Sequence, residues 1–571
     1  MKSQELRKIA PELDPLRIGT GWKAEDLDKM QVFIESTYGD SHPGSAHLNQ
    51  LVGLVEESLA SENMKGAKYY TTDICDGESQ GHDGINYSLC SREMITNMIE
   101  IQYEATPFDA CVFLSSCDKA VPSHLKAIAR LNVPSIIIPG GVMNAGPNLL
   151  TLEQIGKYSA QYQRGEISLD EFKYYKHNAC PSCGACSFIG TATTMQIMSE
   201  ALGLALPGTS ILPATSESLK DVARNIGRHV KFLIEKDIKP SDILTKEAFE
   251  NAIMVHAAIA GSTNALLHLP AIAHEAGIEL TGEDFDRIHR NIPYILNIRP
   301  SGFYPAQYYY YAGGTPAIME AIKDHLHLDV LTVTGKTLGE NLEDLKKSGY
   351  YEKCHSFLKD VNVKREDIMY PVEKPLNKEG AIAVLKGNLA PEGAVVKHSA
   401  VPKNMQEVVL SARVFDCEEE AIDAILKHRI LPGEAVFIRY EGPKGSGMPE
   451  MFYTTEAISS DPELSAAIAL LTDGRFSGAS KGPAIGHISP EAASGGPIAL
   501  VEDGDLIEIS VKNRLLNIIG IKGEKKSLEE IDKILVERKK NWQPREPKYK
   551  KGALGLYTKH AVSPMKGGYM D

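Results

Sequence analysis

The sequence lacks the long apolar segments of secreted and membrane proteins. Its first residues, MKSQE, contain no apolar core of a signal peptide, and no later apolar run approaches the roughly 20 residues of a membrane span. The chain has 75 acidic and 61 basic residues, so its net charge is −14. Because nucleic acids are bound by clustered positive charge, this composition argues against such a partner. We expect a cytoplasmic protein that binds neither membrane nor nucleic acid.

Cysteine is sparse, with nine residues in a chain of 571. In the reducing cytosol that we expect, thiols serve metal binding or catalysis rather than disulfides. Two common enzyme motifs are also missing. Residues 441–450, EGPKGSGMPE, lack the order G-x-x-x-x-G-K-[ST] of a P-loop ATPase. Residues 472–478, TDGRFSG, have Arg475 where the G-x-S-x-G elbow of an α/β-hydrolase needs glycine.

Short apolar runs alternate with helical patterns in the first part of the chain. Such alternation predicts βαβ units and a mainly parallel sheet, and so an α/β domain over residues 1–372. Its middle, residues 191–322, has Ala and Leu at helical spacing and is predicted to be rich in helices. The expected strands are 31–35, 68–72, 110–114 and 133–139.

The composition changes near residue 370, where short strands separated by Gly, Asn and Pro begin. This pattern predicts a mostly β domain, barrel or sandwich, over residues 373–545. Residues 546–571 are predicted to form an irregular tail. The expected strands of this part are 381–385, 394–397, 435–440 and 506–511.

Residues 115–119, SSCDK, directly follow a predicted buried strand. Open α/β sheets bind their ligands at the carboxyl ends of strands. Cys117, Asp118 and Lys119 would therefore bring a thiolate, a carboxylate and an amine to such a position. A buried Cys with a solvated Asp and Lys is the alternative interpretation.

The densest group of thiols is CPSCGAC, residues 180–186. Close thiolates on a small-residue backbone are typical of an iron–sulfur cluster site. Zinc is a competing interpretation, although a zinc ribbon needs a second C-x-x-C, and a redox C-x-x-C is a third. Cys117 could supply another thiolate from the neighbouring loop.

Oxygen ligands for Mg²⁺ are predicted at Asp76, Asp118 and Glu450, which lie in glycine-rich or strand-end settings. Simple solvation of these loop acids is the alternative. Residues 261–264, GSTN, form a polar cluster in an apolar neighbourhood. They suit a helix N-cap, and a substrate carboxylate at a helix N-terminus would use the same residue types.

Six motifs in order resemble the dihydroxy-acid dehydratase and phosphogluconate dehydratase family, which also includes sugar-acid (aldonate) dehydratases. The resemblance spans about residues 21–520. The motifs are CDGESQGHDG (75–84), SSCDK (115–119), CPSCGACSFIGTATTM (180–195), AGSTNALLHLPAIAHEAG (260–277), RYEGPKGSGMPEM (439–451) and TDGRFSGASKGPAIGHISPEAASGGP (472–497).

The resemblance implies an α/β N-terminal domain, a C-terminal β-barrel domain, an active site between them, and assembly as a homodimer or homotetramer. It also implies roles for individual residues: an iron–sulfur cluster on Cys117 and Cys186, Mg²⁺ on Asp76, Asp118 and Glu450 with a carbamylated Lys119 as a further oxygen ligand, and Ser477 as the base.

The resemblance fails at one position that bears on the cluster. Members with a [2Fe-2S] cluster carry a third Cys in a loop T-P-C-N-x-H, whereas residues 42–47 read HPGSAH and have Gly44 there. The cluster is therefore expected to be [2Fe-2S] or [4Fe-4S]. Cys183, Cys180 or Cys75 could replace the missing thiolate, and the sequence analysis favours Cys183.

The motifs lead to a dehydratase that converts a 2,3-dihydroxy acid to a 2-keto acid. Residues 75–81, CDGESQG, resemble the aldonate and phosphogluconate members, so a sugar acid such as xylonate is the expected substrate. The alternative is the dihydroxy-acid dehydratase of branched-chain amino-acid biosynthesis, whose members have similar segments at 439–451 and 472–478. A non-catalytic iron–sulfur sensor with this fold is a third hypothesis, which retention of the metal and base positions disfavours.

Overall fold

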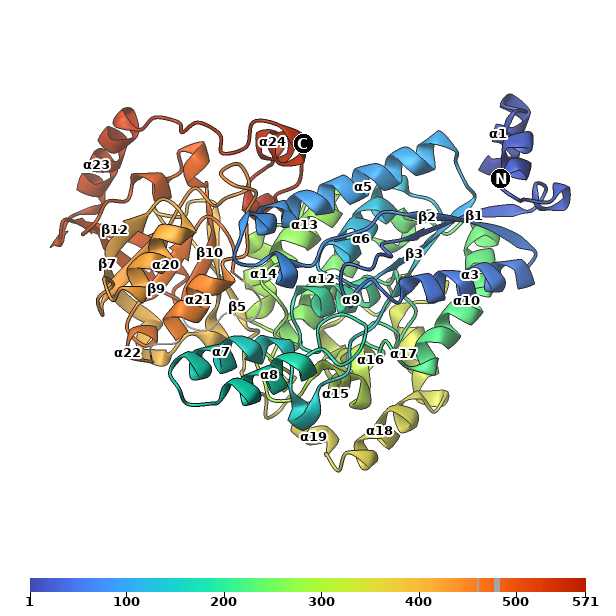
Figure 1. Ribbon diagram of the computed structural model, residues 1–571, viewed down its shortest axis with the longest axis horizontal. Coiled ribbons are helices and arrows are strands. Elements are labelled where there is room, and N and C mark those ends of the chain that lie inside the picture. The colour runs from blue at the N-terminus through green and yellow to red at the C-terminus, as the bar shows by residue number, and fades with distance from the viewer. Residues whose placement is uncertain (460–461, 477–482) are drawn as a thin grey trace.

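The computed structural model describes residues 1–459, 462–476 and 483–571, and within them the chain forms two sheets, one in each half (Figure 1). The N-terminal sheet has four parallel strands in the order β2-β1-β3-β4. The predicted α/β class with a mainly parallel sheet is therefore confirmed. The strands are β1 (Met30–Ser36), β2 (Met64–Tyr70), β3 (Ala110–Ser115) and β4 (Ser135–Pro139).

Helices cover both faces of this sheet. Figure 1 shows α5 (Tyr87–Ala105) and α6 (Ala120–Leu131) on one side and α3 (Leu48–Ser61) and α10 (Glu217–Lys236) on the other. Every residue of β3 is buried as a result. A strand covered on both faces is apolar throughout rather than alternating, which explains why β3 is evident in the sequence.

The position of β2 differs from the prediction. It begins at Met64, before the predicted range 68–72, and ends at Tyr70. Its register with β1 runs from Met30↔Met64 to Ser36↔Tyr70, so pairing recruits residues 64–67 into the strand. Local pattern alone does not report this pairing, which is a tertiary contact.

The helix α10 shows why the middle of the chain is helical. Ser216 caps it, since its side chain accepts a hydrogen bond from the amide of Leu219. Its buried residues recur every three or four positions and form one apolar stripe. They are Leu219, Ala223, Ile226, Gly227, Val230 and Leu233. None of the helices in the described part of the chain combines the length and apolar character that a membrane span requires.

The described C-terminal half forms a mixed nine-stranded sheet that curls into a half-barrel, in agreement with the predicted β-rich domain. The four central strands, β7, β8, β9 and β10, pair with one another in this order and are parallel. The strands on either side of them pair antiparallel. The strands are β5 (Ile382–Leu385), β6 (Gly393–Lys397), β7 (Glu407–Phe415), β8 (Glu434–Ile438), β9 (Ala469–Thr472), β10 (Ala484–Ser489), β11 (Leu506–Ser510), β12 (Leu515–Ile521) and β13 (Glu524–Lys525).

The two halves share part of one apolar core. Ile382 and Val384 of β5 belong to the same buried cluster as the N-terminal sheet. Next to them, α14 (Gly282–His289) contacts β5, and the amide of Ile382 donates to Nδ1 of His289 at 3.2 Å. This packing fixes the loops of one half against those of the other.

Residues 546–571 are predicted to form an irregular tail, but part of this segment is helical. It contains α24 (Gly552–His560), which packs on α5. Leu554, Tyr557 and Ala561 pack with Leu89 and other residues in a small buried cluster. Helix formation in this segment therefore depends on an apolar surface supplied by the N-terminal half.

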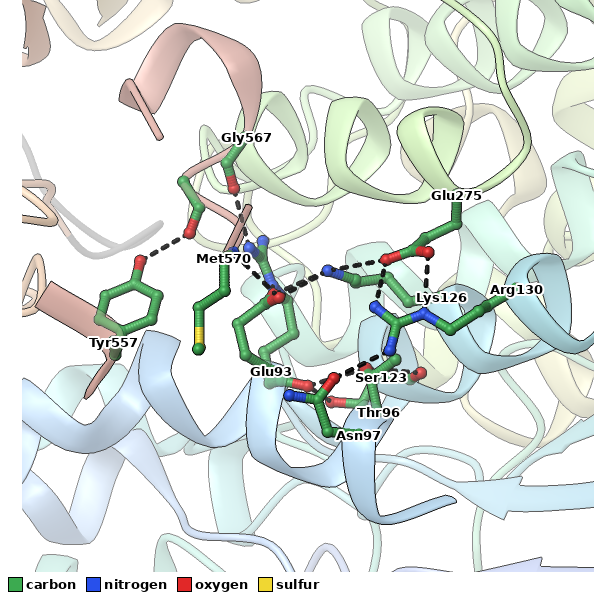
Figure 2. A network of polar contacts seen from close by, with 12 residues as sticks. Glu93, Thr96, Asn97, Ser123, Lys126, Arg130, Glu275, Tyr557, Gly567 and Met570 are labelled. Carbon is green, nitrogen blue, oxygen red and sulfur yellow. Dashed lines mark hydrogen bonds and ion pairs between the residues drawn. The ribbon is translucent and has the colours of Figure 1, made fainter. Parts of the chain in front are cut away.

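A buried ionic network also holds the C-terminus (Figure 2). Lys126 pairs with Glu93 at 2.8 Å and with Glu275 at 3.3 Å. The amide of Met570 donates to Glu93 at 3.2 Å, and Arg92 donates to the carbonyl of Gly567 at 2.9 Å. The end of the chain thereby adds hydrogen bonds to Arg92 and Glu93, two buried charged groups of α5 that also pair with each other.

Candidate active site

Three loops that follow β1, β2 and β3 meet at the carboxyl edge of the N-terminal sheet. The loop after β1 carries His42 and Gly44, the loop after β2 leads into α4 (Asp76–Ser79), and β3 is followed at once by Cys117. The hydroxyl of Ser116 donates to the carbonyl of Gly44 and joins two of these loops. Parallel strands end at the same edge, so residues distant in sequence converge there.

His42, Cys75 and Cys117 form a compact group at this edge. One ligand atom from each lies within 4.8 Å of the others. The thiol of Cys117 donates to Cys75, which raises the pKa of Cys117 and lowers that of Cys75. The ring of His42 is held at Nε2, which lies 2.8 Å from a carboxylate oxygen of Asp73. Thiols and imidazole are the donors that soft metals and iron–sulfur clusters use.

The loop that carries residues 180–186 lies against the same group. The amide of Gly184 donates to the carbonyl of Pro43 at 2.9 Å. Gly184 has φ +112, and a Cβ there would lie 2.6 Å from the amide nitrogen of Met143, so only glycine allows this approach. Burial and the charges of Asp118 and Cys75, among others, raise the pKa of Cys186, and Cys186 lines the same cavity as Asp118.

The predicted thiols are therefore not all equivalent. In the described residues, the group within 4.8 Å contains Cys117 and Cys75, while Cys186 and Cys183 lie outside it. Burial raises the pKa of Cys183. The hydroxyl of Ser182 donates to the carbonyl of Cys183 at 3.0 Å.

The predicted magnesium ligands line one cavity of about 330 Å³ between the two halves. Asp76 and Asp118 come from the N-terminal half, and Glu450 comes from the loop after β8. The amide of Ala192, at the start of α9 (Thr191–Ala201), donates to Asp118 at 2.9 Å. The same cavity is also lined by the largely apolar side chains of Leu152, Ile155, Phe172, Phe188, Phe452 and Tyr453, and by the charged side chains of Glu153 and Lys176.

Two buried cations balance the charge of these acids. Lys119 lies 2.7 Å from Asp76, and the guanidinium of Arg475 pairs with Asp76 at 3.3 Å and with Glu450 through its other nitrogen. Burial would raise the pKa of Asp76, but the charges of Lys119 and Arg475 lower it to about 2. Burial and the charge of Asp76 raise the pKa of Asp118 to about 7.

Asn264 belongs to the site, although residues 261–264 are expected to serve mainly as a helix N-cap. It stands at the N-cap position of α13 (Ala265–Glu275) but makes no side-chain cap bond. Instead, its amide donates to Glu450 at 2.5 Å and to Thr191 at 2.7 Å. Its Oδ1 is buried and has no hydrogen-bond partner in the described structure. Carboxylates with an orphaned amide oxygen are the donors that Mg²⁺ prefers, so the residues present fit this ion.

Arg475 and Ser88 are two further site residues that were not predicted from the sequence. Ser88 donates to Asp76 at 2.6 Å and accepts from Arg475 at 2.8 Å. An arginine inside the glycine-rich run TDGRFSG, residues 472–478, was the available signal for Arg475. The predicted base, Ser477, lies outside the described residues.

The chain is similar to known proteins over nearly its whole length. The family model described as dihydroxy-acid/6-phosphogluconate dehydratase N-terminal matches residues 29–341, and the corresponding C-terminal model matches residues 367–568. A dihydroxy-acid dehydratase of Caldanaerobacter subterraneus is 42% identical over 96% of this chain and 95% of its own. Proteins of the same name from Halothermothrix orenii (42%, over 96% of each chain) and Methanosarcina barkeri (40%, over 99% of this chain and 100% of its own) are also similar.

Proposed function

Because the chain belongs to the dihydroxy-acid/6-phosphogluconate dehydratase family, we propose that it dehydrates a 2,3-dihydroxy acid with a branched aliphatic chain to the corresponding 2-keto acid. The chain is a dehydratase, that is, a hydro-lyase. The expected sugar-acid substrate is less well supported than the alternative, because the similar proteins are named dihydroxy-acid dehydratases.

The observation that carries this choice of substrate is the lining of the cavity. Besides the carboxylates, the cavity wall includes the apolar side chains of Leu152, Ile155, Phe188 and Phe452. An aliphatic branch would bury its methyl groups on that wall, with a gain of about 0.8 kcal/mol for each buried methylene equivalent. The hydroxyl groups of a sugar acid would instead lose hydrogen bonds to water there.

The cofactors of the proposal are an iron–sulfur cluster on Cys117 and Cys186 and a Mg²⁺ ion on Asp76, Asp118 and Glu450. Lys119 would add an oxygen ligand to Mg²⁺ if it is carbamylated. When bound, the two metal centres would supply the Lewis acidity that makes the C2 hydrogen acidic and the C3 hydroxyl a better leaving group.

The residues of the chain would orient the substrate and move its proton. Arg475 holds Asp76 and Glu450 in place, and Asn264 holds the other side of Glu450. Ser477, two residues after Arg475, is the proposed acceptor of the C2 proton. It can accept that proton only as an alkoxide, which requires a lowered pKa of its hydroxyl. Loss of that proton and of the C3 hydroxyl gives an enol, which tautomerises to the 2-keto acid. Assembly as a homodimer or homotetramer remains part of the proposal.

A substrate panel tests this function. Anaerobically purified protein with Mg²⁺ is incubated with 2,3-dihydroxyisovalerate, xylonate or 6-phosphogluconate, and 2-keto acid is measured. We expect the highest kcat/KM with 2,3-dihydroxyisovalerate and loss of turnover after chelation of the metal. A higher kcat/KM with either sugar acid would support the sugar-acid reading instead. No keto acid from any substrate would support the non-catalytic sensor.

A further inference from the structure

The group formed by His42, Cys75 and Cys117 contains one thiol more than the proposed cluster site uses. Cys75 lies at the start of α4, directly before Asp76, which lines the cavity. Its sulfur lies within 4.8 Å of the Cys117 sulfur. Two thiols at this distance, on two separate loops, provide a bidentate site for iron without movement of the backbone.

The loop after β1 offers no thiol to this group. Gly44 lies against Cys117, since a Cβ at position 44 would be 3.3 Å from the Cβ of Cys117. The same atom would be 3.0 Å from Nδ1 of His42, so the imidazole lies beside the space that a side chain at position 44 would enter.

The hydrogen bonds of His42 favour a positioning role over ligation. Its Nε2 lies 2.8 Å from Asp73, and its Nδ1 accepts from the amide of Gly44 at 3.2 Å. Both ring nitrogens are therefore engaged by the protein. The ring is held in place beside the two sulfurs, and a thiolate is left as the group that can bind metal.

The loop that carries Cys186 lies beside the group formed by His42, Cys75 and Cys117. Its Gly184 is hydrogen-bonded to Pro43, next to Gly44, and Cys186 lines the same cavity as Asp76, the residue after Cys75. Cys183, in contrast, lies outside the compact group of the described residues and is half-buried.

From these contacts we infer that Cys75, and not Cys183, is the third protein ligand of the iron–sulfur cluster, together with Cys117 and Cys186, and that His42 positions the loops around it. The inference rests on the proposed function, because it presupposes a cluster at Cys117. Three thiolates would leave one iron of a [4Fe-4S] cluster without a protein ligand.

Matched serine variants test the assignment. Cys75→Ser, Cys183→Ser and Cys117→Ser are reconstituted anaerobically, and iron, acid-labile sulfide and visible absorbance per chain are measured. We expect Cys75→Ser to retain less than half of the wild-type iron and sulfide and Cys183→Ser to match the wild type. Wild-type values in Cys75→Ser, or a loss confined to Cys183→Ser, would overturn the inference. Full iron in Cys117→Ser would instead refute the cluster of the proposed function.

Thiol labelling of the wild-type protein covers the case in which Cys75→Ser fails to fold. The native holoprotein and the same protein after removal of the cluster are treated with iodoacetamide and mapped by mass spectrometry. Protection of Cys75 that ends when the cluster is removed supports the inference, with Cys183 labelled in both samples. Labelling of Cys75 in the holoprotein, or cluster-dependent protection of Cys183 alone, contradicts it.

Discussion

At the scale of single residues, Arg475 connects the two halves of the site. Its guanidinium is fully buried and lies between Asp76 of the N-terminal half and Glu450 of the C-terminal half. Its Nε also donates to the carbonyl of Met448 at 2.8 Å. A fork of fixed donors suits this bridging position better than the single ammonium group of a lysine.

We expect Arg475→Met to be strongly destabilising in the metal-free protein. Removing one partner leaves buried charges uncompensated, at a cost of about 3–5 kcal/mol. The change in apparent Tm measured by calorimetry checks this. Arg413→Met is the matched control, because the Arg413–Asp503 pair is exposed and such pairs contribute about 1 kcal/mol or less. An equal decrease in Tm for both variants would contradict the bridging role.

At the scale of elements, β1 contains a buried acid without a cationic partner among its hydrogen bonds. Glu35 is fully buried, accepts from the hydroxyl of Thr71, and has a second oxygen without a partner in the described structure. Burial raises its pKa from 4.5 to about 8. Glu35 is therefore protonated in the folded protein at neutral pH, which lets an acid lie inside the sheet.

This shift predicts a pH dependence of stability. Between pH 4.5 and 8 the unfolded chain has released the Glu35 proton while the folded protein retains it, so stability decreases as pH rises. Glu35→Gln removes this contribution. We expect its Tm, relative to the wild type, to be several degrees higher at pH 8 than at pH 5. Glu407→Gln, at the exposed start of β7, is the control and should show the same Tm difference from the wild type at both pH values. The same pH-independent difference in Glu35→Gln would contradict the prediction, because it would mean that Glu35 is ionised in the folded protein.

At the scale of the whole molecule, residues 567–571 contact both α24 and the N-terminal half and connect them. Tyr557 donates to the carbonyl of Gly568 at 2.6 Å, Tyr569 stacks on His274 with ring centroids 4.0 Å apart, and Met570 bonds to Glu93. Figure 2 shows Gly567 and Met570 beside the Glu93–Lys126 pair. The C-terminus is thus part of the buried structure.

Deletion of residues 567–571 should therefore lower the stability of the whole protein. It removes the acceptor of the Arg92 Nη2 group and a donor to Glu93, and each buried group left unsatisfied costs about 1–3 kcal/mol. Thermal unfolding followed by circular dichroism measures the loss. Lys566→Ala, an exposed change next to the deletion, should leave the Tm unchanged. An unaltered Tm of the deletion variant would show that the contacts of residues 567–571 do not stabilise the protein.

Features that depend on residues close together in the chain were predictable from the sequence. The apolar run of β3 specified a buried strand, and the next residues, Cys117 to Lys119, were therefore placed correctly at its carboxyl end. Helical periodicity likewise specified the helices of the middle segment. Burial pattern and chain direction are local properties, so they can be read from a short stretch of sequence.

The contacts between distant loops, in contrast, are visible in the fold alone. Asp76 and Arg475 are 399 positions apart and Asn264 and Glu450 are 186 apart, yet each pair is in contact. The same holds for the thiols. Cys183 was the expected third cluster ligand, whereas the fold places Cys75 beside Cys117. Contacts between loops are set by strand order, register and the packing of the two halves, and no local pattern of residues encodes these long-range pairings.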